Sequence, residues 1–219
     1  MVMVIGGILD RHELAALREA AEGLAFEDGK ATAGRYARAV KANLQARPSE
    51  GLEAVLDTVR GKLQANDLFA SVARPRHFAR VLVSRYGPGM EYGLHVDDPI
   101  MKGHRTDLSF TLPLSQPDEY DGGELMIDDA IEERMIKLQA GDVVVYPTSA
   151  LHRVAPVTRG ERLAVVGWVT SWVRDPARRE VLHDLDVAAR AIFEDQGKTS
   201  AFDRLFKAKS NLTRMWADD

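Results

Sequence analysis

Residues 140–173 read AGDVVVYPTSALHRVAPVTRGERLAVVGWVTSWV, and this stretch decides the fold class. It alternates short runs of β-branched and aromatic residues with turn signals made of glycine, proline, aspartate and serine. Such runs are typical of antiparallel β-structure, because valine, tyrosine and tryptophan suit a pleated strand while glycine and proline interrupt it. The stretch therefore predicts an all-β barrel or a double-sheet jelly roll.

The same pattern extends upstream to about residue 77, and helical patterns flank it on both sides. Asp10 and Glu13 have the spacing of a capping box, and Ser49 opens a second helix with a continuous apolar stripe. Two more apolar stripes follow residue 175, separated by a polar break at 196–200. We expect a mainly β protein with flanking helices: an N-terminal flank (1–76), a β-core (77–173) and a C-terminal helical extension (174–219). The expected core strands are 78–86, 108–114, 124–127, 135–138, 142–146, 152–157 and 163–173.

Composition narrows the classes of function. The chain has 219 residues, which fits one large domain, and its formal net charge of −4 gives no overall basic field for nucleic acid. It has no cysteine, so thiolate catalysis, disulfides and sulfur-ligated metals are excluded. The apolar start at 1–9 lacks the basic flank of a signal peptide and is too short to span a membrane. We expect a cytoplasmic protein whose N-terminus is a first strand or a packed segment.

Histidine and carboxylate side chains are the remaining candidates for chemistry. His95 and Asp97 are two residues apart, so an extended chain places both on one face. A facial triad needs a second imidazole, and His152, which begins a predicted strand, is the best candidate. His77 and His104 are the rivals, and we expect both to face solvent. Asp98 is expected to point away from Asp97, because neighbouring residues on a strand face opposite ways.

Arg162 lies ten residues after His152. The tripeptide 158–160, with glycine last, is suited to a three-residue hairpin loop, which would pair residue 157 with 161 and His152 with Val166. His152 and Arg162 would then share a face, roughly 13 Å apart. A metal at His152 and a guanidinium from Arg162 would bracket a small dicarboxylate. A surface arginine is the plainer alternative.

With these residues in place, the sequence resembles the Fe(II)- and 2-oxoglutarate-dependent dioxygenases, and within them the bacterial PKHD-type hydroxylases of the PiuC and YbiX group. The motif His-x-Asp…His…Arg matches His95, Asp97, His152 and Arg162. The resemblance implies a double-stranded β-helix core, Fe(II) on the first three residues, and 2-oxoglutarate and O₂ as co-substrates. It assigns Arg162 and Tyr86 to the far carboxylate of 2-oxoglutarate, Trp168 to its vicinity and Tyr92 to the substrate side. It implies no catalytic acid or base.

The resemblance also implies an oxidative decarboxylation of 2-oxoglutarate to succinate and CO₂, with L-ascorbate as a possible reductant. The substrate would be peptidyl or a siderophore-like small molecule. Two other readings stay open at this point: a cupin-like metal enzyme with another reaction, and a non-catalytic metal- or ligand-binding barrel. The C-terminal stripes belong either to a core or to a subunit interface, and we expect a homodimer through them.

Overall fold

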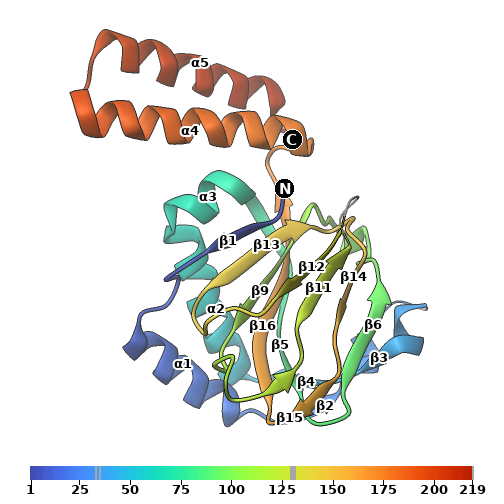
Figure 1. Cartoon of the computed structure of the whole chain (residues 1–219). Helices are drawn as coiled ribbons and strands as arrows, with labels where there is room; N and C mark the ends of the chain where they lie inside the picture. The colour runs from blue at the N-terminus through green and yellow to red at the C-terminus, as the bar shows by residue number, and fades with distance from the viewer. Residues whose placement is uncertain (33, 35, 129–131, 219) are drawn as a thin grey trace.

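The computed structural model describes residues 1–32, 34, 36–128 and 132–218, with only the backbone at 31 and 32. Within these residues two antiparallel sheets face each other, which confirms the predicted jelly-roll core (Figure 1). The larger sheet has the order β1 (Met3–Ile5), β13 (Val143–Pro147), β9 (Leu108–Pro113), β16 (Arg162–Ser171), β5 (Pro75–Tyr86), β4 (Leu44–Ala46) and β2 (Phe26–Asp28). The smaller sheet has the order β12 (Glu133–Ile136), β11 (Leu125–Asp128), β14 (His152–Val154), β6 (Glu91–His95) and β3 (Lys41–Ala42).

One face of the larger sheet forms the main hydrophobic core. Side chains of a strand alternate between its two faces, and every second residue of the central strands, such as Val83, Phe110 and Val165, is buried in this core. Helices α2 (Glu50–Ala65) and α3 (Asp67–Ala73) cover it with their own apolar stripes, and Phe69 of α3 packs edge-on against Phe110. Each fully buried side chain of this size contributes about 1.5–3 kcal/mol to folding.

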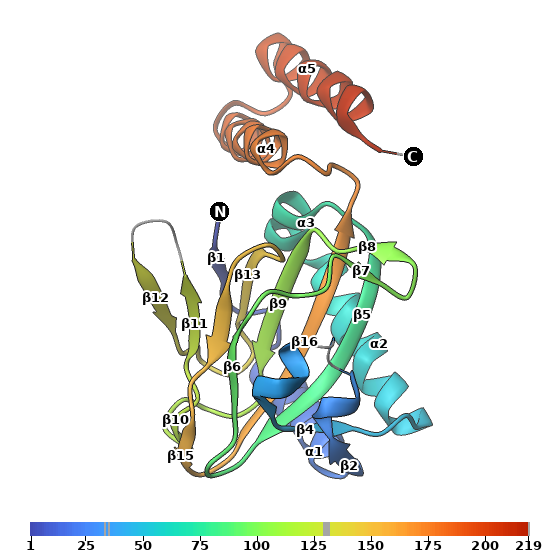
Figure 2. The same cartoon turned by 90° about the vertical axis from the view of Figure 1, so that its right-hand side faces the viewer.

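The other face of the larger sheet looks toward the smaller sheet. Directly opposite residues of β5 and β16 share that face, and they form a ladder: Tyr86 with Arg162, Ser84 with Ala164, Leu82 with Val166, and Arg80 with Trp168. Figure 2 shows β6 on one side of these long strands and α2 on the other. The strand pattern of the sequence therefore separates a structural face, packed by helices, from an interior face that is free to hold polar side chains.

The predicted hairpin between His152 and Val166 is wrong. Strand β14 lies in the smaller sheet between β11 and β6, whereas β16 lies in the larger sheet between β9 and β5. The residues between them form β15 (Val157–Arg159), which pairs with β10 (Asp121–Gly122) as a separate two-stranded ribbon. Gly160 does adopt the predicted left-handed conformation, with φ of 73°. The turn therefore carries the chain from one sheet to the other instead of folding it back on itself.

The N-terminal region forms the predicted helices and, at β1, the first strand that was one of the two expectations for residues 1–9, together with strands β2, β3 and β4 that the sequence did not indicate. Asp10 and Glu13 cap α1 (Arg11–Glu22) reciprocally, and Ser49 caps α2, as predicted. The short strands β1, β2 and β4 extend the larger sheet at its two edges, while β3 extends the smaller one. Consecutive strands β3 and β4 thus cross from one sheet to the other. The helical turns η1 (Gly29–Thr32) and η2 (Ala37–Val40) precede them, and η2 contacts β6.

The C-terminal helices α4 (Pro176–Gln196) and α5 (Ser200–Trp216) form an antiparallel pair beyond the end of β16 (Figures 1 and 2). They contact each other through Phe193 and Phe202, whose ring centroids are 5.2 Å apart. A polar cluster joins the pair to α3, because Asp186 accepts hydrogen bonds from Arg74, Ser71 and Lys209. Among the described residues, no helix is long and apolar enough to cross a bilayer.

Candidate active site

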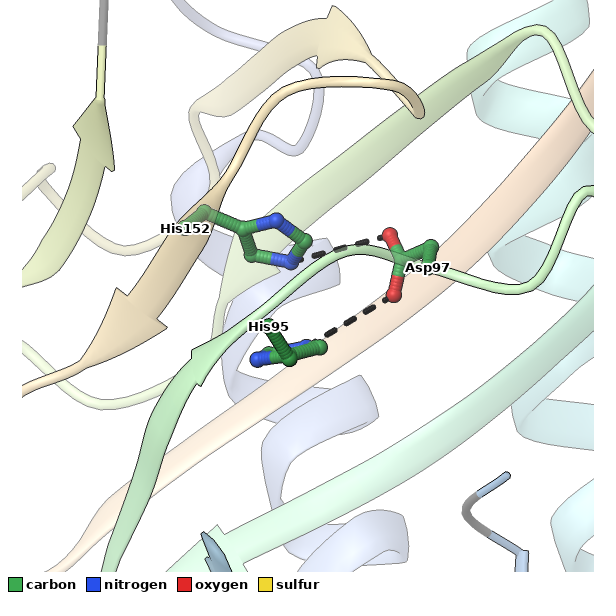
Figure 3. A group of neighbouring side chains, drawn as sticks. All are labelled: His95, Asp97 and His152. Carbon is green, nitrogen blue, oxygen red and sulfur yellow. Dashed lines mark ion pairs between the residues drawn. The ribbon is translucent and has the colours of Figure 1, made fainter. Parts of the chain in front are cut away.

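The three predicted metal ligands meet between the two sheets. His95 ends β6 and His152 begins β14, and the two residues are directly opposite each other in the smaller sheet. Asp97 follows two residues after His95, with its carboxylate oxygens 3.7 Å from His95 Nε2 and 3.6 Å from His152 Nε2 (Figure 3). One ligand atom from each residue lies within 4.8 Å of the others, and all three side chains are buried. In the described part of the chain, no other cluster of potential ligands is this compact.

Backbone carbonyls fix which nitrogen of each imidazole faces this centre. His95 Nδ1 lies 2.8 Å from the carbonyl oxygen of Gly93, and His152 Nδ1 lies 3.0 Å from that of Ala150. A carbonyl oxygen only accepts hydrogen bonds, so each Nδ1 carries a proton, and the neutral form of each ring would present its Nε2 lone pair to the centre. The Nε2 lone pairs of the two histidines and the carboxylate of Asp97 therefore point toward one centre, with no proton between them. This donor set fits a divalent cation.

Two hydroxyl groups support the carboxylate of Asp97. Ser109 Oγ lies 2.8 Å from Asp97 Oδ2 and 3.2 Å from Thr148 Oγ1. The Ser109 hydroxyl has a single proton, so when it donates to the carboxylate it accepts from Thr148. Ser109 projects from β9, opposite Trp168 of β16, and so reaches the site from the interior face of the larger sheet.

Aromatic rings confine both imidazoles. Tyr92 stacks on His95 with a centroid distance of 3.6 Å, and Tyr146 packs edge-on against His152 at 5.1 Å. Burial, followed by the charge of His152, lowers the pKa of His95 to about 4. Burial raises the pKa of Tyr92 and of Tyr146 above the usual tyrosine value. The rings keep bulk water away from the imidazoles and restrict their rotation.

Arg162 lies deeper along the interior ladder, next to two tyrosines. Its side chain is only 4% exposed, and its guanidinium lies 5.3 Å from the ring centroid of Tyr86, the residue opposite it on β5. A hydrogen bond joins it to Tyr120. Among the described residues no carboxylate pairs with it, and its Nη1 has no hydrogen-bond partner. A buried cation without an anion costs several kcal/mol, so this position is suited to binding the carboxylate of a ligand.

Tyr86 and Trp168 line the same cavity as the triad and Arg162. Burial raises the pKa of Tyr86 to about 12, so its hydroxyl stays protonated and can donate a hydrogen bond. Trp168 Nε1 is buried and has no acceptor among the described residues. The cavity therefore offers three groups that can donate a hydrogen bond to a ligand: Arg162 Nη1, Trp168 Nε1 and the protonated hydroxyl of Tyr86.

The rival ligands lie outside the centre, as expected. Asp98 is exposed beside the buried Asp97. His77 and His104 are both exposed and pack against each other, with ring centroids 4.9 Å apart and no third ligand among the described residues.

The sequence did not indicate Lys41 of β3, Asn43 between the strands, and Gln45 of β4, which all line the cavity. A polar residue at every second position is the signal that could have identified a strand with its polar face turned inward. Burial, and next the charge of Arg80, lowers the pKa of Lys41 to about 8.

Comparison with known proteins agrees with this geometry. The sequence profile of the 2OG-Fe(II) oxygenase superfamily matches residues 81–170, and that of the PKHD-type hydroxylase C-terminal domain matches residues 176–218. A PKHD-type hydroxylase of Maricaulis maris is 57% identical over 194 residues, 89% of each chain. Others from Parvibaculum lavamentivorans and Synechococcus elongatus are 49% and 46% identical, over the full length of both chains in each pair.

Solved structures show the same fold at lower identity. A prolyl-4-hydroxylase of Pseudomonas putida matches with a TM-score of 0.52 and 24% identity, covering 78% of this chain and 92% of that one. A prolyl hydroxylase of Trichoplax adhaerens, solved with a hypoxia inducible factor peptide, matches with a TM-score of 0.57 and 15% identity, covering 83% and 86%. Both matches support the jelly-roll architecture. With relatives of this identity along its whole length, the chain belongs to the PKHD-type hydroxylases, which are 2-oxoglutarate-dependent dioxygenases that use Fe(II) and O₂.

Proposed function

We propose that His95, Asp97 and His152 hold one Fe(II), and that Arg162 and Tyr86 hold the far carboxylate of 2-oxoglutarate. The inward-facing lone pairs of the triad and the spare Nη1 of the buried Arg162 carry this assignment. Three protein ligands on one face of an octahedral ion leave the other positions to the co-substrates. The iron supplies the redox chemistry that side chains lack.

The surrounding residues would position the co-substrate and exclude water. The fork of Arg162 can bind a carboxylate through two parallel hydrogen bonds, while the protonated Tyr86 adds a third donor. Trp168 Nε1 supplies a further donor in the same cavity. Overall, one oxygen atom of O₂ would enter a C–H bond of the substrate as a hydroxyl group. The other would enter succinate as 2-oxoglutarate loses CO₂. No side chain is required as a general acid or base.

Metal binding is the first test. Anaerobic titration should give about one Fe(II) per chain, and His95→Ala or His152→Ala should abolish tight binding because each removes one of three ligands. His77→Ala, an exposed histidine outside the site, is the matched control and should bind normally. Adding 2-oxoglutarate to the Fe(II)-loaded protein should produce the weak visible band of the chelate. Undiminished iron binding in both triad variants would refute the assignment.

Co-substrate binding is tested separately at Arg162. Removing one partner of a buried ion pair costs about 3–5 kcal/mol, so Arg162→Ala should raise the Kd of 2-oxoglutarate by about two orders of magnitude or more. Fe(II) affinity should be nearly unchanged. Lysine should restore binding only in part, because it lacks the planar fork. Arg153→Ala, on the exposed side of β14, is the control. Equal 2-oxoglutarate affinities for wild type and Arg162→Ala would contradict the role given to Arg162.

The wider setting is also a proposal. We infer a cytoplasmic enzyme whose oxygenase core spans 77–173 between the N-terminal flank and the C-terminal helical extension. Its substrate would be peptidyl or siderophore-like, with Tyr92 on the substrate side and L-ascorbate as a possible reductant. Tyr92 lies against His95 and lines the metal-site cavity, which supports a role beside the reacting group.

The C-terminal helices support a proposal of a homodimer. No residue of α5 is buried, and Val187, Phe193, Phe206 and Met215 of the helical pair are 47–72% exposed. Apolar surface of this kind is often covered by a second copy of the chain. Light scattering of the full chain should therefore give the mass of a dimer. A monomer at tens of micromolar would contradict the proposal.

A further inference from the structure

Tyr120 is a buried residue that holds the guanidinium of Arg162. It immediately precedes β10, it is only 2% exposed, and its hydroxyl group is hydrogen-bonded to Arg162. An arginine side chain can only donate hydrogen bonds, so the phenolic oxygen of Tyr120 accepts this one. Arg162 Nη1 has no partner among the described residues. One part of the guanidinium is therefore bound within the protein while another part is free to bind a ligand.

Tyr120 is separated from the proposed co-substrate by Arg162. The cavity that contains the triad is lined by Arg162 and Tyr86, whereas Tyr120 lines a smaller neighbouring cavity, again together with Arg162. Arg162 thus borders both cavities. Any effect of the Tyr120 hydroxyl on a ligand at the triad would therefore be transmitted through the guanidinium.

Two glycines allow Tyr120 and Arg162 to approach each other. A Cβ added at Gly123 would lie 3.1 Å from Arg162 Cδ and 3.1 Å from Tyr120 Cε2, and one added at Gly160 would lie 2.9 Å from Tyr120 Cα. Carbon atoms pack best at about 3.5–4.0 Å, so any larger residue at these positions would push the tyrosine or the arginine away. The space around the pair is thus matched to these two side chains.

Further contacts fix Tyr120 in the absence of a ligand. Lys137 Nζ donates to the carbonyl oxygen of Tyr120 at 2.8 Å and lies 4.2 Å from the centroid of its ring. The next residue, Asp121, pairs with Arg159 at 2.7 Å across the ribbon of β10 and β15. A donor that is held in its binding position before the ligand arrives binds more tightly, because less conformational freedom is lost on binding.

We propose that Tyr120 is a positioning residue for 2-oxoglutarate: it fixes the guanidinium of Arg162 at one place in the cavity, and so sets the length of the dicarboxylate that reaches both Arg162 and the metal. This inference rests on the proposed function, because it requires the far carboxylate to bind Arg162. The stem of arginine is flexible, and losing its bond to Tyr120 would let the fork follow carboxylates at several distances. The metal ligands would keep their places.

The test compares 2-oxoglutarate with 2-oxovalerate, which has the same carbon chain and the same chelating end but no far carboxylate. Each is titrated anaerobically into Fe(II)-loaded protein, and the visible band of the chelate reports binding. Wild type should bind 2-oxoglutarate about two orders of magnitude more tightly than 2-oxovalerate. Tyr120→Phe keeps the ring and removes the hydroxyl. It should weaken 2-oxoglutarate about five- to tenfold and leave the affinities for 2-oxovalerate and Fe(II) unchanged.

Selection for length is measured with oxaloacetate and 2-oxoadipate, which are one methylene shorter and one longer than 2-oxoglutarate. Wild type should prefer 2-oxoglutarate to both, and Tyr120→Phe should narrow that preference at least about threefold. Tyr36→Phe is the matched control, because Tyr36 is exposed and lines neither cavity. It should bind all four ligands as wild type does.

Lys137→Met is a second variant, which keeps the phenol but removes the contacts that hold it. It should lower the ratio of the 2-oxoglutarate and 2-oxovalerate affinities in the same direction but by less, and it decides the question if Tyr120→Phe does not fold. An unchanged ratio would overturn the inference. An equal loss of affinity for both ligands in Tyr120→Phe would also overturn it, since that result means general damage to the site. Failure of the proposed function has a different signature, because Arg162→Ala would then keep the wild-type preference for 2-oxoglutarate over 2-oxovalerate.

Discussion

At the scale of single residues, the carboxylate of Asp97 depends on a hydroxyl that the sequence motif does not contain. Ser109 is 2% exposed and lies within hydrogen-bond distance of both Asp97 and Thr148. Groups that hydrogen-bond a metal ligand fix its orientation, and losing one typically costs 10–100-fold in metal affinity or activity. The orientation of Asp97 toward two imidazoles therefore rests on β9 as well as on the segment that follows β6.

Ser109→Ala should weaken Fe(II) binding about tenfold or more without abolishing it, because the three ligands stay in place while one carboxylate oxygen loses its donor. Thr148→Val should have a smaller effect, since it acts on Asp97 only through Ser109. Anaerobic titration against a competing chelator measures both. Ser115→Ala is the control, because Ser115 is equally buried but accepts from the backbone of Leu163. Equal iron affinity in Ser109→Ala and wild type would show that Asp97 needs no such support.

The sequence identified the triad because each ligand lies in an extended segment between clear turn signals. His95 and Asp97 share a face through strand periodicity, and His152 begins a β-branched run. Lys41, Asn43 and Ser109 were missed for a physical reason. They face inward from strands whose interior side is polar, and single-sequence periodicity treats a polar face as solvent-exposed. Only the pairing of two sheets reveals that such a face is enclosed.

At the scale of elements, strand positions followed from local sequence but strand partners did not. The predicted run 163–173 corresponds to β16, and 108–114 to β9. Which strands pair depends on contacts between residues far apart in sequence. The turn at 158–160 was therefore predicted to close a hairpin, although the chain passes from one sheet to the other there. Arg162 still reaches the site, because it pairs with Tyr86 of β5 across the larger sheet. The predicted dicarboxylate position therefore has a different structural origin from the one that the spacing suggested.

Gly160 is the residue on which that crossing depends. Its φ of 73° suits glycine, and an added Cβ would lie 2.0 Å from the carbonyl oxygen of Glu119. Gly160→Ala should therefore lower the free energy of unfolding by at least about 2 kcal/mol, as measured by urea denaturation. It should also weaken 2-oxoglutarate binding, because Arg162 follows two residues later. Gly61→Ala is the matched control: Gly61 lies inside α2 with open space around it, so alanine should stabilise by about 0.5–1 kcal/mol. Similar effects at both positions would contradict this account of the turn.

At the scale of the whole molecule, one carboxylate joins the C-terminal helices to the rest of the chain. Asp186 of α4 accepts from Ser71 Oγ of α3 at 2.8 Å, from Nη2 of Arg74, the C-cap of α3, at 2.5 Å, and from Lys209 Nζ of α5 at 2.6 Å. Ser71 gives its proton to Asp186, so its 2.9 Å contact with His183 requires the histidine Nδ1–H to donate. Leu182 and Ala189 of α4 are buried as well, and the polar cluster around Asp186 adds hydrogen bonds to both α3 and α5.

The protonation of Asp186 should therefore control the docking of these helices. Burial by itself raises the pKa of Asp186, but the hydrogen bonds from Lys209 and Ser71 and the charge of Arg74 outweigh it, so its pKa is lowered from 3.8. A carboxylate with a lowered pKa stabilises the folded chain above its unfolded pKa, and that stabilisation is lost as the pH falls through its folded value. Asp186→Asn should cost about 2 kcal/mol at pH 6–7, which is about 4–8 °C in Tm for a chain of this size.

The difference in Tm between wild type and Asp186→Asn should begin to shrink as the pH falls below the unfolded value of 3.8, and it should vanish below the lower folded pKa, where the wild-type carboxylate is protonated and loses the same interactions. Asp184→Asn, an exposed carboxylate on the same helix, is the control and should change Tm little at any pH. Hydrogen exchange of α4 and α5 gives a local readout: both helices should exchange faster in Asp186→Asn while β5 and β16 keep their protection. Uniform acceleration over the whole chain would instead mean that Asp186 stabilises the molecule globally, and an unchanged Tm at neutral pH would show that apolar contacts alone hold the helical pair.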